Sequence, residues 1–140
     1  MPIERGKDWG TPAPPGFVDA VATTDAEVRQ IVENSWAKGV EIPPIGILGG
    51  DLWRALGAPV GGMQRIQSRE ARMVPLDAAQ VQIGNRHCVS VAHVFCLKHW
   101  WAGPIIAVMN SEWREKWRVA PRAHPNDGQL ELLEGDLPIK

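Results

Sequence analysis

Apolar residues recur with a helical period between residues 24 and 38. Thr24 and Glu27 have the spacing of a capping box at the start of this stretch, and Gly39 is the residue type that commonly follows a helix. One face carries the apolar residues Val28, Ile31, Val32 and Trp36. Their spacing predicts an amphipathic helix over 24–38, for which we expect a structural role rather than a chemical one.

A second pattern consists of a short apolar run, a glycine turn and a short helix. The run Ile45–Leu48 has the length and composition of a buried strand. The turn Gly49-Gly50-Asp51 follows it directly and leads into a helical stretch, Leu52–Leu56. The turn has two interpretations. Its glycines could let the backbone approach a phosphate group, or the turn could be a plain strand-to-helix connection in which Asp51 is the N-cap of the following helix. Both interpretations describe a reduced α/β piece over residues 17–60.

From residue 71 onward the pattern changes to short β-rich runs separated by Gly, Asn and Pro. Gly84-Asn85-Arg86 in particular is typical of a hairpin turn. The predicted strands are Met73–Leu76, Ala79–Ile83, His87–Leu97, Pro104–Met109, Trp113–Val119 and Leu130–Leu133. The fold class expected from this spacing is α+β, mainly an antiparallel β-sandwich or partly closed barrel, with one N-terminal amphipathic helix and a short strand-turn-helix piece.

A loop, a turn and a strand follow one another near the end of the sequence. Pro121 and Pro125 each fix φ and remove an N–H donor, which predicts irregular structure between them. Asn126-Asp127-Gly128 supplies the residue types of a tight turn. The alternation that follows predicts a strand with one buried apolar face, Leu130 and Leu132, and one face in water.

The length of 140 residues fits one domain. Residues 1–16 contain several prolines and glycines without a period, so we expect an extended arm there. Trp9 suggests that this arm lies across a neighbouring chain, which would make the protein a homo-oligomer. Residues 17–140 are expected to form a single α+β domain, with its β-rich part over residues 71–140.

The composition disfavours several classes of function. The net charge is −1 and basic residues are dispersed among acidic ones, so nucleic acid is not an expected partner. The roughly 18 consecutive apolar residues of a membrane-spanning helix are absent from the sequence. The N-terminus has no apolar stretch of the kind found in a signal peptide. Two cysteines fit a reducing compartment, and we expect a cytoplasmic protein.

Two of these segments resemble motifs of the diacylglycerol kinase family of lipid kinases. Residues 119–135 are similar to the family's Ala-Pro…Asp-Gly motif in its C-terminal β-domain, with Glu131 where the family has a second Asp. The matching residues are Ala120, Pro121, Ala123, Asp127, Gly128, Leu130 and Leu132. The turn Gly49-Gly50-Asp51 matches the start of the family's phosphate loop, Gly-Gly-Asp-Gly-Thr, but Leu52 and Trp53 replace its last two residues.

The resemblance implies an activity and a set of site residues. Members of this family transfer the γ-phosphoryl group of ATP to a lipid hydroxyl with Mg²⁺, in a cleft between two lobes. This chain has room for one lobe and a fragment of the other. By resemblance we expect Mg²⁺ and ATP as cofactors, and a nucleotide, a phosphorylated lipid or another small molecule as the ligand. The residues implied are Asp51 and Asp127 for catalysis, Asp127 and Glu131 for the metal, Gly49, Gly50, Arg122, Asn126 and Gly128 for cofactor binding, and Arg114 and Arg118 as further phosphate clamps.

Two other functions stay open on the sequence. Trp100-Trp101 and the N-terminal arm fit a non-catalytic β-domain that binds a partner chain or a small ligand. A metal site is the other alternative, because five residues of ligand type fall within thirteen positions: His87, Cys88, His93, Cys96 and His99. On one extended strand, however, they would alternate between opposite faces. Hydrolysis is not expected, because no nucleophile elbow surrounds Ser90 or Ser111.

Overall fold

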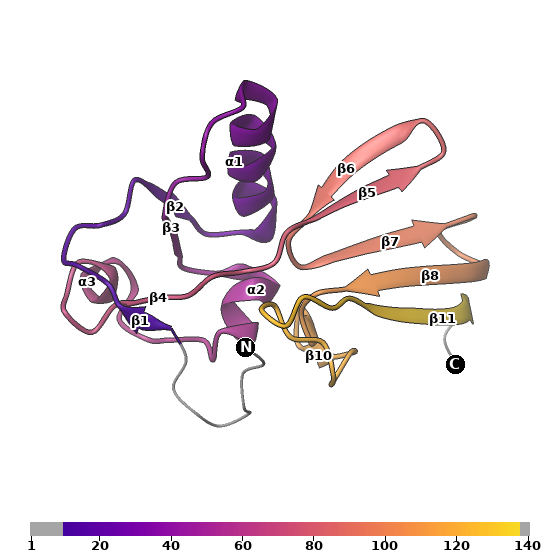
Figure 1. Ribbon diagram of the computed structural model, residues 1–140. Helices are drawn as coiled ribbons and strands as arrows, with labels where there is room; N and C mark the ends of the chain where they lie inside the picture. Colours follow the sequence, from indigo (N-terminus) through magenta and orange to yellow (C-terminus); the bar gives the residue numbers. More distant parts are fainter. Residues whose placement is uncertain (1–9, 138–140) are drawn as a thin grey trace.

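The structure of the protein, a computed structural model, describes residues 10–137. Residues 1–9 of the expected arm, including Trp9, lie outside the described part, and so does the oligomer contact predicted for them. Figure 1 shows two halves, with the helices and the first short strands on one side and the later strands on the other. Within residues 10–137, no helix combines the length and the apolar character that crossing a membrane requires.

A small parallel β-α-β unit forms the centre of the helical half. Strands β2 (Ala20–Ala22) and β3 (Ile45–Ile47) pair in parallel, and helix α1 (Asp25–Lys38) connects them. Both strands therefore end at the same edge of the pair, and each strand is followed directly by a helix. This edge places the start of α1 beside the turn at residues 49–51.

The ends of α1 are those that the sequence predicts. The Oγ1 atom of Thr24 accepts the N–H of Glu27 at 3.2 Å, and Gly39 follows the helix with a φ of 63°. The predicted apolar face is wrong at one position. Trp36 is 42% exposed and Ser35 is buried in its place, because the core lies beneath only part of the predicted apolar stripe.

Two further short helices and a two-stranded sheet complete this half. Helix α2 (Gly50–Ala55) follows β3 as predicted, and α3 (Gly62–Ile66) comes next. Strands β1 (Thr11–Pro12) and β4 (Arg72–Met73) pair antiparallel. The described end of the arm, residues 10–16, thus pairs with its own chain through β1.

The second half consists of antiparallel strands. Its one three-stranded sheet has the order β11-β8-β7, and two hairpins, β5–β6 and β9–β10, accompany it. The strands are β5 (Ala79–Ile83), β6 (Arg86–Ser90), β7 (His93–Leu97), β8 (Gly103–Met109), β9 (Trp113–Arg114), β10 (Trp117–Arg118) and β11 (Glu131–Leu137).

The expected fold class is confirmed at the level of an α+β chain with mostly antiparallel strands. The predicted hairpin turn at Gly84 joins β5 to β6, with a φ of 61° at that glycine. The predicted strands over 87–97 and 113–119 are each two strands. Residues 10–137 form one three-stranded and four two-stranded sheets, so the closed sandwich is not confirmed.

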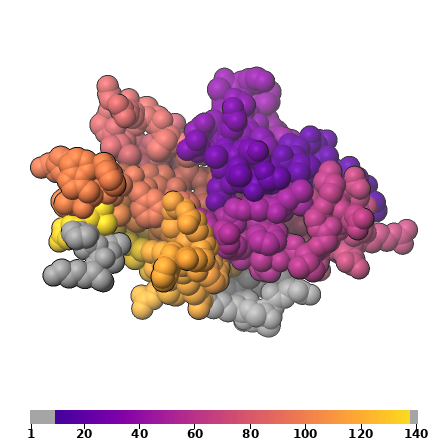
Figure 2. Space-filling view, turned by 180° about the vertical axis from the view of Figure 1, so that it is seen from behind, coloured from indigo at the N-terminus to yellow at the C-terminus, as the bar shows by residue number. Residues whose placement is uncertain are grey.

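The two halves share their hydrophobic interior. A first cluster of buried residues includes side chains from both halves, and the strand half contributes Val89, Val91 and Ala92 to it. Its other members are Ala22, Val28, Val32 and Leu52. A second cluster lies within the strand half and contains Ala107, Met109, Ala120 and Ala123. Figure 2 shows the two halves in contact, the first in indigo to magenta and the second in salmon to yellow.

Strand β11 faces the opposite way from the prediction. Leu130 and Leu132 are 44% and 59% exposed, whereas Leu133 packs against the second cluster. Glu131 pairs with Met109 of β8 and has one carboxylate oxygen buried. Pairing with β8 sets the alternation, and the buried Ala107 and Met109 of that strand require their partners to face inward.

The two strand-to-helix turns of the parallel unit are packed against each other. A Cβ atom on Gly49 would lie 2.4 Å from the carbonyl oxygen of Thr23, closer than real Cβ contacts. At Gly50 the φ is 95°, and a Cβ would lie 2.5 Å from a carboxylate oxygen of Asp25. The glycine pair is therefore required by the contact between the turns, whatever ligand the turn binds.

We predict that Gly49→Ala lowers the free energy of unfolding by about 1–3 kcal/mol, because the added methyl group overpacks the turn. Urea denaturation measures the loss. Gly135→Ala is the matched control, since a Cβ at Gly135 meets Ile105 at an ordinary 3.7 Å. An equal loss in both variants would contradict the role given to the close approach.

Candidate functional site

The candidate site lies where α2 meets the strand half, and Asp51 is at its centre. The Asp51 side chain is only 4% exposed. Its predicted role as N-cap is wrong, because Gly49 occupies that position and Asp51 is the second residue of the helix. The cap comes instead from Asp25, whose two carboxylate oxygens accept the N–H groups of Asp51 at 2.7 Å and Leu52 at 2.9 Å.

The Asp51 carboxylate joins α2 to the β9–β10 hairpin. Its Oδ1 atom accepts a hydrogen bond from Arg54 Nη1 at 2.7 Å and another from the backbone N–H of Glu115 at 2.6 Å. Arg114 Nη1 lies 4.0 Å from Oδ2. Glu115 has a φ of 55°, which is rare outside glycine and is held here by the bond to Asp51.

His93 approaches the same carboxylate from β7. Its Nδ1 atom lies 3.8 Å from Asp51 Oδ2 and is buried without a hydrogen-bond partner among the described residues. Burial lowers the pKa of His93 below its ordinary value of 6.5; the nearby Asp51 carboxylate raises this pKa and the Arg114 guanidinium lowers it again. The imidazole is therefore held neutral beside a buried carboxylate.

A pair of buried polar residues connects this centre to both clusters. Asn110 and Ser111 are fully buried. The Asn110 side-chain amide donates to the carbonyls of Asp77 at 2.9 Å and Val91 at 3.0 Å. The Ser111 hydroxyl donates to the backbone carbonyl of Asp51 at 3.0 Å. These bonds satisfy loop backbone groups and fix the strand half onto α2.

The turn of the second predicted motif lies against the segment 75–77. The Asn126 side-chain amide donates to the carbonyl of Pro75, and the N–H of Gly128 donates to Asp77 Oδ2 at 2.7 Å. Asp127 accepts the N–H of Gln129 at 2.9 Å. Asp127 is thus engaged in its own turn and is not part of the Asp51 network.

The described residues contain no large cluster of metal-ligand side chains. Among residues 10–137 no group of three or more His, Cys, Asp or Glu side chains lies close enough to hold a metal ion. This covers the five histidines and cysteines between residues 87 and 99, which do not form such a group. Mg²⁺ commonly binds through only one or two carboxylates together with water and phosphate, so the implied pair Asp127 and Glu131 stays a prediction.

The cationic residues implied as phosphate clamps are mostly engaged with carboxylates. Arg114 pairs with Glu115 at 2.8 Å, and Arg118 pairs with Glu112 at 2.7 Å. Arg122 is exposed in the loop that follows β10. The structure brings Arg114 to Asp51 but leaves the other two outside that centre.

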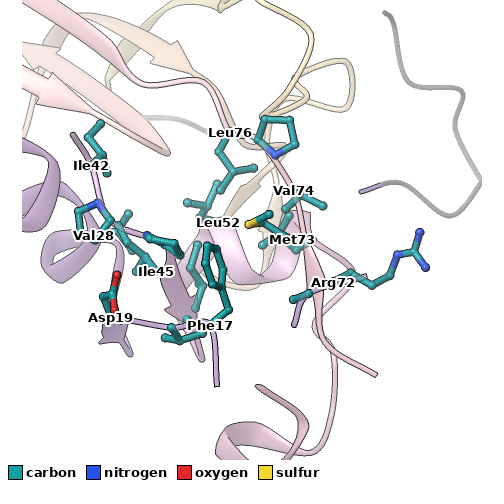
Figure 3. A pocket seen from close by; sticks show the side chains of 18 of the residues that line it. Phe17, Asp19, Val28, Ile42, Ile45, Leu52, Arg72, Met73, Val74 and Leu76 are labelled. Atoms are coloured by element: carbon teal, nitrogen blue, oxygen red, sulfur yellow. The ribbon is translucent and has the colours of Figure 1, made fainter. Parts of the chain in front are cut away.

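An apolar cavity of about 970 Å³ lies beside α2, with most of its wall from the helical half and part of it from residues 76–78 and from Val91 of the strand half. Leu52, next to Asp51 in sequence, forms part of its wall. Figure 3 shows Phe17, Ile45 and Leu76 arranged around the same space. The motif turn at 126–128 contacts this wall too, through Pro75 and Asp77, which line the cavity.

The charged residues of the cavity wall are mainly acidic. Asp19, Glu41 and Asp77 line it, together with the single cation Arg72. In Figure 3 the Arg72 side chain points away from the labelled apolar residues, and its guanidinium donates to the carbonyl of Gly10 at 2.7 Å. The electrostatic environment of the cavity therefore disfavours an anionic group.

Sequence reasoning identified Asp51 but missed its partners. Asp25 and Glu115 are 26 and 64 residues away from it, and His93 was assigned only to a metal alternative. The cavity was missed as well, because its wall comes from several short segments between Thr11 and Val91. A local motif contains no signal for such contacts.

No protein-family model, curated protein or solved structure matches this chain. The resemblance to lipid kinases therefore rests on the two motifs described above.

We predict that Asp51→Asn lowers the free energy of unfolding by about 2–3 kcal/mol, because the Arg54 and Glu115 hydrogen bonds lose a buried charged acceptor. Chemical denaturation measures this change. Asp136→Asn, at an exposed position of β11, is the control and should leave stability nearly unchanged. Equal stability of wild type and Asp51→Asn would contradict the proposed junction.

Stability is also expected to depend on pH through His93. Since the folded pKa lies below 6.5, the unfolded chain takes up the proton first, and the free energy of unfolding should fall as pH drops below about 6.5. Denaturation series between about pH 5 and 8 measure the slope. We expect His93→Gln to reduce it and the exposed-site control His99→Gln to retain it. An unchanged slope in His93→Gln would refute this assignment.

Proposed function

We propose that this chain is a binding domain for an amphiphilic small molecule of the lipid class, whose apolar part occupies the cavity beside α2. The cavity carries this proposal. Its volume of about 970 Å³ is at the upper end of the range of small-molecule sites, and its wall is predominantly apolar. The resemblance of the two motifs to lipid kinases favours a lipid over other apolar ligands.

The charge of the wall narrows the class of ligand. Three carboxylates line the cavity, although that of Asp77 also accepts the N–H of Gly128, and the one cation on its wall is directed elsewhere. A neutral head group, such as the hydroxyl and ester groups of an acylglycerol, would lose less there than a phosphate or carboxylate would. We therefore propose a neutral lipid rather than a phosphorylated one.

Phosphoryl transfer from ATP, which the resemblance also implies, has less support. The N–H groups at the start of α2, which a phosphate would need, donate to the carboxylate of Asp25. Binding without catalysis is thus the function that this geometry favours. It shares the absence of catalysis with the alternative open on the sequence, but it places the ligand in the cavity rather than at Trp100-Trp101.

The proposal predicts that dioctanoylglycerol raises the unfolding temperature of the protein by about 9 °C at a hundredfold excess over its dissociation constant. Dioctanoyl phosphatidic acid has the same chains and an added phosphate, and should bind at least about fivefold more weakly. ATP with Mg²⁺ should leave the unfolding temperature unchanged. A rise with ATP and Mg²⁺, and none with either lipid, would favour the kinase instead.

A matched pair of variants tests the location of the ligand. Ala71→Trp places a large side chain on the cavity wall, whereas Ala37→Trp makes the same change on the exposed face of α1. We expect the first to weaken dioctanoylglycerol binding by about tenfold or more through lost volume, and the second to leave it unchanged. Equal affinities in both would place the ligand outside the cavity.

A further inference from the structure

The turn between β7 and β8 exposes two adjacent tryptophans. Trp100 is 78% exposed and Trp101 is 60% exposed; the two rings contact one another, and Trp101 also contacts the ring of His99, each at a centroid distance of 5.4 Å. Leu97 and Ile106, on the two strands that lead into and out of the turn, are also exposed, at 44% and 41%. An exposed aromatic group of this size is unusual unless it has a partner.

The turn is also free of steric obstruction. Figure 1 shows it at the end of the three-stranded sheet that is farthest from the helices. In Figure 2, seen from behind, the orange segment around residue 100 projects at the edge of the molecule. This position at the edge of the molecule agrees with the exposure of both tryptophans.

The charges around the turn nearly cancel one another. Residues 78–111 contain no Asp or Glu, while Lys98 is exposed in the turn and Arg86 beside the neighbouring hairpin turn. On β11, Asp136 pairs with Pro104 and is exposed at the same end, with Glu134 further along. These two carboxylates balance the two cations, so aromatic burial dominates and electrostatic attraction is secondary.

The ring geometry argues against a sugar ligand. The planes of Trp100 and Trp101 are inclined at 85°, in an edge-to-face contact. The two rings therefore do not form one flat platform on which a sugar ring would stack. Indole side chains do suit the water–hydrocarbon boundary of a bilayer, because the ring is apolar and its N–H bonds to head groups or water.

We propose that the β7–β8 turn inserts Trp100 and Trp101 into the interfacial layer of a lipid bilayer, with Leu97 and Lys98 at its rim. The chain then binds at a membrane surface without spanning it. This inference depends on the exposed turn and not on the cavity, so it stands or fails independently of the proposed lipid ligand.

The test is flotation of the full chain with phosphatidylcholine vesicles, with and without a fraction of phosphatidylserine. We expect wild type to float with both. Trp100→Ala combined with Trp101→Ala should reduce binding by about tenfold or more, because two large apolar groups no longer leave water. Trp117→Ala is the control, since Trp117 is 66% exposed on β10, outside this turn, and should bind like wild type.

A second readout separates insertion from adsorption. Phosphatidylcholine brominated on its acyl chains should quench the part of the wild-type tryptophan fluorescence that comes from Trp100 and Trp101. In the double variant, which lacks both, the brominated lipid should leave the fluorescence unchanged. Lys98→Glu should weaken binding only to vesicles that contain phosphatidylserine. Circular dichroism spectra checked against wild type ensure that the variants are folded.

Three results would overturn the proposal. The first is failure of wild type to float with either vesicle, and the second is flotation of the double variant to the same extent as wild type. The third is that wild type does not bind vesicles but forms a concentration-dependent dimer, and that the double variant does not form this dimer. That result would assign the turn to contact with a second copy of this chain.

Discussion

A buried carboxylate is the constraint on which the arrangement of the two halves depends. Transferring the Asp51 charge out of water is costly unless strong hydrogen bonds replace the lost hydration. The structure supplies them from Arg54 on the same helix and from the backbone of Glu115 in the strand half. Since the two donors come from different halves, satisfying the charge also fixes α2 against the β9–β10 hairpin. The buried hydroxyl of Ser111, bonded to the Asp51 carbonyl, reinforces the same contact.

The features predicted correctly from the sequence are those whose signals lie within a few residues. The capped helix α1, the hairpin turn at Gly84 and the irregular loop after Val119 are of this kind. The burial phase of β11 was predicted wrongly, because pairing with β8 decides it and the leucine pattern alone is ambiguous between the two faces. Local propensity and tertiary pairing thus agree at the turns and disagree at this edge strand.

The candidate site shows the same division. The sequence indicates Asp51 as a site residue because it follows two glycines. These glycines are required, however, by the close approach of the Thr23 carbonyl and the Asp25 carboxylate, which leaves no room for a Cβ atom. Because Asp25 of the first turn caps α2, this short helix does not need a capping side chain at its own N-cap residue, Gly49. A glycine-rich turn therefore has two physical explanations, and only the neighbouring chain distinguishes between them.

The distances along the sequence between these contacts have a consequence for the rate of folding. Asp51 bonds to residues 60 and 64 positions further on, whereas α1 and the β5–β6 hairpin are closed by neighbouring residues. Closing a long loop costs more chain entropy than closing a short one, and folding slows as such contacts dominate. We therefore expect the junction at Asp51 to form late in folding, after α1 and the β5–β6 hairpin, so that the carboxylate loses its hydration only when the two halves meet.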